Sequence, residues 1–177
     1  SQASPVDLES EDINNADTVT TQDLVVNGTA TGPFGSELQG CRVFLSSNQN
    51  FTNVQKVELD QVQYDSGGNF DTTNHHFTCP ETGVYLVKVQ LAFEGGSDGD
   101  ERRVRIGSTS DSSPFDSGAN VRLPSNSVNR LQASTVNKYD LGDTIAAYAA
   151  NFASNDELDS GKESRATHLE VVFLGSL

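Results

Sequence analysis

Apolar and polar residues alternate most regularly between Val84 and Phe93. Successive side chains of an extended strand point to opposite faces, so one face of this segment is apolar throughout. Its members are Tyr85, Val87, Val89, Leu91 and Phe93. The opposite face carries a mixed set, Leu86, Lys88, Gln90 and Ala92. This period of two predicts a central strand whose apolar face lies in the core of a sheet.

Shorter segments with strand character lie on both sides of this central strand. They are residues 42–46, 55–60, 102–106, 128–136, 144–150 and 168–174. Turn-forming residues separate them, and residues 94–101, 107–126 and 151–165 are predicted to be polar loops. No segment keeps a 3.6-residue period. The pattern therefore predicts an all-β sandwich or jelly roll of about ten antiparallel strands.

The first 40 residues differ in composition from the rest of the chain. They contain neither Lys nor Arg, and only the stretch 23–26 has strand character. Their seven acidic residues are Asp7, Glu9, Glu11, Asp12, Asp17, Asp23 and Glu37. By itself such a segment buries too little apolar area to offset the entropy of ordering it. The sequence therefore predicts two parts, an extended acidic N-terminal arm (1–40) for anchoring or assembly and a folded head (41–177).

The chain is strongly acidic, with a formal net charge of −14. A surface of this sign repels phosphate, so nucleic acid is not an expected partner. Only 4 of the 11 basic residues are Lys. An acid-rich, Lys-poor composition favours a halophilic source, where molar salt screens charge repulsion; an ordinary acidic surface that aids solubility is the alternative. No apolar run approaches the roughly 18 residues of a membrane-spanning helix, so no membrane insertion is expected.

One set of five residues has a specific spacing. Asp65, Phe70, Phe77, Gly83 and Tyr85 are separated by four, six, five and one residues. This spacing resembles the signature of the C1q/TNF-like jelly-roll family, and the resemblance covers residues 41–175. Supporting segments are Arg42-Val43-Phe44-Leu45, Leu141-Gly142-Asp143-Thr144 and residues 168–174. The resemblance implies a C1q-like jelly-roll head that acts as a homotrimeric binding module.

Each residue of this signature has an expected structural role. Phe70 and Phe77 are expected to be core aromatics, which bury a large apolar area. Gly83 is expected at a hairpin turn, where a glycine readily adopts a positive φ. Tyr85 is expected to begin the central strand, and its hydroxyl needs a hydrogen-bond partner when buried. None of these roles implies catalysis.

The chain also departs from the family pattern. Leu59, Val87 and Val89 stand where the family usually has aromatic residues, which predicts a more aliphatic core. No collagen-type Gly-X-Y repeat lies before the head in this sequence, so the complement-like arrangement of a head on a collagen stalk is not expected. The short acidic arm takes the place of that stalk.

Catalysis has little support in the sequence. His75 and His76 are adjacent and would point to opposite faces of a strand, and His168 lies far along the chain. No nucleophile elbow Gly-x-Ser-x-Gly, phosphate loop or zinc-ligand spacing occurs. We therefore expect a binding protein and not an enzyme, with no cofactor other than the calcium considered next.

Two acidic loops are candidate calcium sites, because hard oxygen ligands in loops suit Ca²⁺. The candidate ligands are Asp98, Asp100 and Glu101 in one loop and Asp156, Glu157 and Asp159 in the other. Neither run fits an EF-hand, and solvated loop acids are the favoured alternative.

Cys41 and Cys79 are the only cysteines. The sequence leaves open whether they form one disulfide or remain buried thiols.

Together these features favour a structural and binding function. The favoured hypothesis is a homotrimeric spike, decoration or fibre head on the virion surface of a halophilic archaeal virus. The arm would contact other virion structural proteins, and the polar loops of the head would contact a host surface glycan or protein. The alternative is a secreted or cell-surface C1q-like module that recognises glycan or protein in the extracellular space. Candidate trimer contacts are Leu86 with Ala92, or Tyr148 with Ala146 and Ala150.

Overall fold

The computed structural model describes residues 39–95, 101–108, 117–122, 129–161 and 166–177. The predicted arm (1–40) lies outside this part of the chain except for its last two residues. The described residues form eleven strands and no helix, and hence no helix long and apolar enough to cross a membrane. The predicted all-β class is confirmed.

The strands follow one another closely along the chain. They are β1 (Gly40–Phe44), β2 (Gln49–Lys56), β3 (Gln61–Ser66), β4 (Phe70–Asp71), β5 (His76–Thr78), β6 (Gly83–Gly95), β7 (Glu101–Ser108), β8 (Ser117–Arg122), β9 (Asn129–Tyr139), β10 (Thr144–Leu158) and β11 (His168–Gly175). The predicted central strand is therefore β6, which extends slightly beyond both predicted ends.

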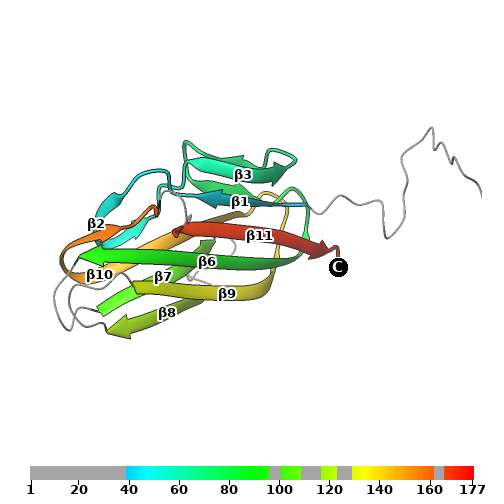
Figure 1. Ribbon diagram of the computed structural model, residues 1–177. Coiled ribbons are helices and arrows are strands. Elements are labelled where there is room, and N and C mark those ends of the chain that lie inside the picture. Colours follow the sequence, from blue (N-terminus) through cyan, green and yellow to red (C-terminus); the bar gives the residue numbers. More distant parts are fainter. Residues whose placement is uncertain (1–38, 96–100, 109–116, 123–128, 162–165) are drawn as a thin grey trace, which may run out of the picture. The chain divides into compact units, whose positions relative to one another are not determined.

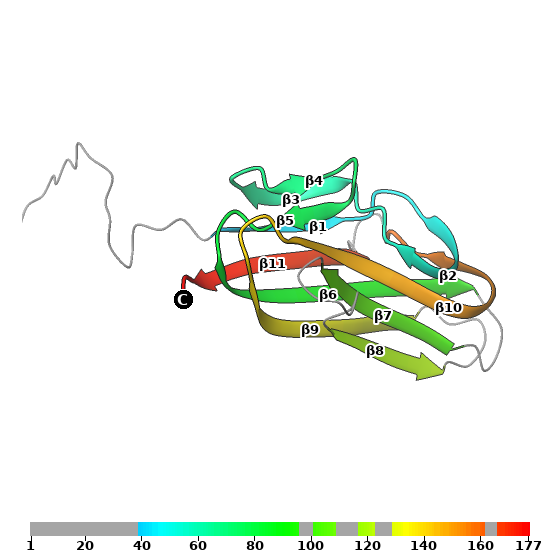
Figure 2. The same ribbon diagram turned by 180° about the vertical axis from the view of Figure 1, so that it is seen from behind.

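The strands pack as two antiparallel layers. One layer has the order β3-β1-β11-β6-β9 and lies in front in Figure 1. In the other layer, seen from its own side in Figure 2, β10 pairs with β7, β2 and β5, while β8 and β4 pair with β7 and β5. The two layers join at one end, where Phe93 of β6 pairs with Leu158 of β10.

The core lies between the layers and is built from the inward face of each strand. On β6 the residues predicted to face the core are all fully buried, namely Tyr85, Val87, Val89, Leu91 and Phe93. Leu59 is also fully buried, so the positions that depart from the family pattern form an aliphatic part of the core. An aromatic cluster remains around Tyr85, whose ring centroid lies 4.9 Å from that of Phe173, 5.9 Å from Tyr139 and 6.3 Å from Phe77.

Asp65 explains why the signature begins with an acidic residue. Its carboxylate accepts hydrogen bonds from the backbone N–H of Asn69 at 3.0 Å and of Phe70 at 2.8 Å. Between Asp65 and Asn69 the chain turns through Gly67 and Gly68, whose φ values of 96° and 67° favour glycine. The turn delivers Phe70 into the core, where it pairs directly with Phe77 across β4 and β5.

Gly83 is required for a different reason from the predicted one. It is the first residue of β6, and its φ is not positive, so the expected left-handed turn conformation is wrong. A Cβ at this position would lie 2.5 Å from the carbonyl oxygen of Gly175 and would overlap the ring of Phe173. The position is therefore restricted to glycine by close packing between β6 and β11.

Several predicted boundaries are also wrong. Residues 57–60 are not a strand but cross between the layers, because Val57 N–H bonds to Ala147 O of β10 and Asp60 N–H bonds to Phe44 O of β1. Val57 and Leu59 of this crossing segment are buried and Glu58 is exposed, so the segment has the same alternating pattern as a strand. The predicted loops 107–126 and 151–165 contain β8 and the second half of β10, since backbone pairing does not require apolar side chains.

Candidate functional site

An apolar row crosses the outer face of the layer that contains β6. Strand register places Val136 of β9 and Val172 of β11 directly opposite Leu86 of β6. Directly opposed residues share one face of a sheet, and Leu86 and Val136 are 37% and 61% exposed while Val172 is half-buried. We call Val136, Leu86 and Val172 the apolar row. Leu174, 56% exposed, follows two residues farther along β11.

The same outer face becomes polar beyond the apolar row. Arg42 of β1 forms an ion pair with Glu170 of β11, with 2.8 Å between Nη1 and Oε1. Farther along, Gln132 of β9 donates a hydrogen bond to Gln90 of β6. The face therefore has an apolar end beside the C-terminal end of β11 and a hydrogen-bonded polar part next to it.

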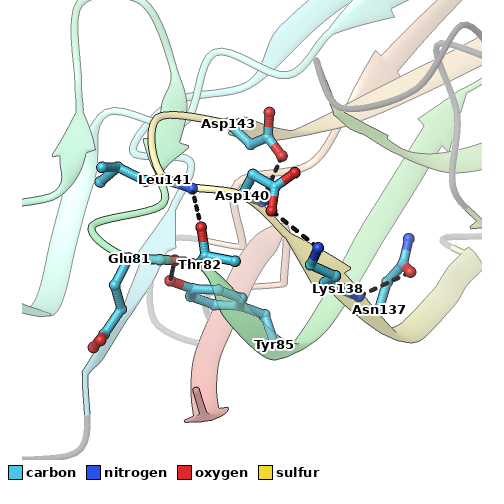
Figure 3. Close-up of polar contacts among 8 residues, drawn as sticks. All are labelled: Glu81, Thr82, Tyr85, Asn137, Lys138, Asp140, Leu141 and Asp143. Atoms are coloured by element: carbon cyan, nitrogen blue, oxygen red, sulfur yellow. Dashed lines mark hydrogen bonds and ion pairs between the residues drawn. The ribbon is translucent and has the colours of Figure 1, made fainter. Parts of the chain in front are cut away.

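Polar contacts tie two turns together at one end of the sandwich (Figure 3). The buried Tyr85 hydroxyl donates to Glu81 O at 2.7 Å, which is the partner that the sequence required. Leu141 N–H donates to Thr82 Oγ1 at 3.0 Å, linking the turn before β6 to the turn before β10. Burial raises the pKa of Tyr85 to about 12, so the phenol stays protonated at neutral pH. This network has a structural role.

A polar cavity of about 380 Å³ lies at a different place in the head. It is formed by the turn between β1 and β2, the crossing segment 57–60 and the turn that precedes β5. Its lining residues are Leu45, Ser47, Asn48, Gln49, Asn50, Glu58, Asp60 and His75. Within the described residues, none from the predicted binding loops lines it, and of the three histidines only His75 does.

Comparison with known proteins identifies the fold. No family model and no curated protein matches the chain. Among solved structures, the Eiger TNF protein of S. frugiperda aligns with a TM-score of 0.61 at 15% identity, covering 79% of this chain and 94% of that one. Murine APRIL aligns with a TM-score of 0.61 at 16% identity, covering 78% and 100% of the two chains. The head has a C1q/TNF-like jelly-roll fold.

A third similar structure comes from the C1q side of this fold. The globular domain of the zebrafish complement 1qA protein aligns with a TM-score of 0.54 at 17% identity, covering 78% of this chain and 99% of that one. At these identities the likeness establishes the jelly roll and leaves function to the side chains.

The jelly roll separates the predicted trimer contacts. Leu86 belongs to the apolar row, whereas Tyr148, Ala146 and Ala150 lie on β10 in the other layer. Ala92 is fully buried, because its backbone bonds to Asp159 N–H and Thr167 Oγ1, and Ala146 and Ala150 are 4% and 1% exposed. Ala92, Ala146 and Ala150 therefore have no surface to offer a neighbour, and those predictions are wrong. Val136 and Val172 were missed because only strand register places them beside Leu86.

The predicted calcium ligands are not brought together within the described residues. Asp98 and Asp100 lie outside that part of the chain, as does the side chain of Asp156. Glu101 forms an ion pair with Arg103 at 2.6 Å, and Asp159 accepts a hydrogen bond from Gly161 N–H at 2.7 Å. The described residues contain no group of three His, Cys, Asp or Glu that could hold a metal ion. Calcium binding remains a prediction.

The three histidines occupy separate structural positions. The ring Nδ1 of His75 lies 2.9 Å from Leu59 O, and that of His76 lies 3.4 Å from Asn74 O. His168 is buried at the start of β11. These contacts place the rings of His75 and His76 against backbone carbonyls, and the expectation that the chain is not an enzyme remains a prediction.

Cys41 and Cys79 are free thiols in separate parts of the core, which corrects the disulfide alternative. Cys41 lies on β1 opposite Val171, and Cys79 follows β5, with its N–H bonded to Asp143 O. Burial is the main reason that the pKa of Cys41 lies far above its usual range and that the pKa of Cys79 is raised to about 12. Both groups are therefore protonated and unreactive at neutral pH.

The thiols provide a direct chemical test of the core. At neutral pH the native protein is expected to show no thiol that reacts with a disulfide reagent such as dithionitrobenzoate, because neither cysteine is accessible or ionised. The unfolded, unreduced protein is expected to react with two, matching the two cysteines of the chain. Thiols that appear only after a reductant is added would show a disulfide instead.

Proposed function

We propose that this chain is a homotrimeric binding head whose subunits meet through the apolar row. The observation that carries the proposal is the row itself, since Val136, Leu86 and Val172 form an apolar strip across three neighbouring strands. Contiguous exposed apolar residues on a soluble protein mark interaction sites. The C1q/TNF-like fold supports a cyclic trimer. In such a trimer the strip of each subunit would lie against its neighbours and be removed from water. The role is binding and not catalysis.

The head is proposed to act on the surface of a virion as a spike, decoration or fibre head. The support comes from the composition, since residues 1–40 carry seven acidic residues and no Lys or Arg, and the whole chain is acid-rich and Lys-poor. In this proposal the arm holds the head to other virion structural proteins of a halophilic archaeal virus, and the head faces the host. Deleting residues 1–38 is expected to abolish incorporation into particles while leaving the isolated head folded.

The second candidate is a secreted or cell-surface module that recognises a glycan or a protein. The polar cavity supports this candidate and the virion role equally, because a preformed pocket for a small polar ligand serves recognition on either surface. The particle experiment separates the two candidates. A head that is never recovered in purified particles, with or without its arm, contradicts the virion role and leaves the extracellular module.

The trimer is tested by placing a charge in the apolar row. In molar salt, which screens the acidic surface, the wild-type chain is expected to scatter light with three times the 18.9 kDa mass of one chain. Val136→Glu is expected to give a folded monomer, because burying an unpaired carboxylate at the interface is strongly unfavourable. A monomeric wild-type protein under these conditions contradicts the proposal.

Val54→Glu is the matched control for this variant. Val54 is also an exposed valine on a strand, 49% exposed, but it lies on β2 in the other layer. It is expected to remain trimeric. Dissociation of both variants to the same degree would show that added negative charge, and not the position of the row, controls assembly.

A further inference from the structure

Hydrogen bonds fix the positions of the segments that line the polar cavity. Asp60 accepts from the backbone N–H of Ser46 at 2.9 Å and from its hydroxyl, which joins the turn after β1 to the crossing segment. Asn48 Oδ1 accepts from both N–H and Oγ–H of the buried Ser160, each at 3.0 Å. The turn between β1 and β2 is thus attached to two other segments. The cavity is therefore preformed.

His75, another residue that lines the cavity, has an unusual backbone conformation. Its φ is 55°, in the left-handed region that is unfavourable for residues other than glycine. Asp71 supports the turn by accepting hydrogen bonds from Thr73 N–H at 2.7 Å and Asn74 N–H at 2.9 Å. The ring Nδ1 donates to Leu59 O, because a carbonyl can only accept, so Nε2 of the neutral ring is an acceptor. Strained residues held in this way cluster at functional sites.

The lining residues retain unused hydrogen-bonding capacity. Asn48 Nδ2, the Asn50 amide, the Glu58 carboxylate and His75 Nε2 have no hydrogen-bond partner within the part of the chain that the structure describes. Asn48 Nδ2 donates, the Asn50 amide both donates and accepts, and the carboxylate and the imidazole nitrogen accept. Residues with free donors and residues with free acceptors therefore line the same cavity, with Leu45 as an apolar lining residue.

We propose that this cavity binds a neutral, hydroxyl-rich ligand of the size of one sugar unit. Each hydroxyl group both donates and accepts, so adjacent hydroxyls of one ring satisfy the Glu58 carboxylate and the Asn50 amide together. An anion is repelled by Glu58 and Asp60, and a simple ammonium group, which only donates, has no acceptor to offer Asn48 Nδ2. The volume of about 380 Å³ lies within the range of about 300–1,000 Å³ that small-molecule sites occupy.

This assignment deepens the proposed binding role by naming the ligand class, and it rests on that role but not on the trimer. Every lining residue comes from a single chain. Sugar binding and assembly are therefore separable properties, and the folded Val136→Glu variant is expected to bind sugar as the wild type does. Assembly and binding are measured on the same samples.

The test is a titration of the full chain with glucose, galactose, mannose and glucosamine, followed by backbone amide chemical shifts. At least one neutral hexose is expected to shift the amides of residues 46–50, 58–60 and 74–76, with millimolar affinity because one sugar ring makes few contacts. Glu58→Ala is expected to weaken binding at least about tenfold, since it removes a hydrogen bond to a charged group. Asn50→Ala is the second variant, and it tests the donor side in case Glu58→Ala fails to fold.

Glu94→Ala provides the matched control, because Glu94 is an exposed carboxylate on β6 that does not line the cavity. It is expected to leave the affinity unchanged. The assignment would be overturned if no neutral hexose shifted these amides. It would also be overturned if glucosamine alone shifted them, because that result would indicate a cation site. Equal loss in Glu58→Ala and Glu94→Ala would also overturn it. A monomeric wild-type protein that still binds a hexose would contradict only the trimer.

Discussion

Replacing Tyr85 with alanine is expected to lower the free energy of unfolding by about 4 kcal/mol. The side chain is fully buried and its ring contacts the rings of Phe173, Tyr139 and Phe77, so alanine leaves a large cavity where β5, β6, β9 and β11 meet. A domain of this size is stabilised by about 5–15 kcal/mol in total. Urea denaturation of the variant, followed by circular dichroism, measures the loss.

Tyr85→Phe separates the ring from its hydroxyl. It keeps the aromatic packing and removes the hydroxyl, which donates to Glu81 O and also hydrogen-bonds with the Cys79 thiol, so it is expected to cost about 1–2 kcal/mol. If phenylalanine destabilised the protein as much as alanine, the hydroxyl and not the aromatic cluster would hold the turn before β6. The comparison therefore shows which part of the signature tyrosine the fold depends on.

Gly83→Ala is expected to lower the free energy of unfolding by about 3 kcal/mol, at the upper end of the cost of overpacking. The new methyl group would meet the carbonyl oxygen of Gly175 at 2.5 Å and would overlap the Phe173 ring. One of these contacts is a backbone atom of the neighbouring strand, so β11 has to shift away from β6. Thermal or urea unfolding measures the loss, and a loosened C-terminal part of β11 is expected in hydrogen exchange.

Gly142→Ala is the control for this variant, because it introduces backbone strain without steric overlap, whereas Gly83→Ala introduces overlap without backbone strain. Gly142 has a φ of 87°, and an added methyl group would meet nothing within 4 Å. Its substitution therefore introduces backbone strain without a clash, at an expected cost of about 1 kcal/mol. If Gly142→Ala were the more damaging of the two, close packing would not be the reason for glycine at position 83.

The core face of β6 is the part of the fold that the sequence predicts best. Alternation from Tyr85 to Phe93 identifies all five residues that face the core, because a sheet with one face in the core imposes a period of two. The same rule fails at residues 57–60, where Val57 and Leu59 are buried on a segment that crosses between the layers. It also misses the second half of β10, whose polar residues are held in a strand by backbone pairing with neighbouring strands.

The surfaces that carry the proposed function depend on contacts between distant segments. The apolar row requires the register between β6, β9 and β11, which places Val136 and Val172 on either side of Leu86. The predicted partner Ala92 alternates onto the same face, yet the backbone of Asp159 and the hydroxyl of Thr167 cover it. Local alternation assigns a residue to a face but does not show what else packs on that face.

By itself, the sequence determined the jelly-roll class, the inward face of the central strand and the division of charge between arm and head. These follow from local periodicity, residue spacing and composition, which are properties of the chain before it folds. Only the tertiary structure decided that Gly83 is needed for its missing side chain, and that Asn48, Glu58 and His75 line one cavity. Such contacts join residues far apart in the chain, and no local pattern encodes the distance between them.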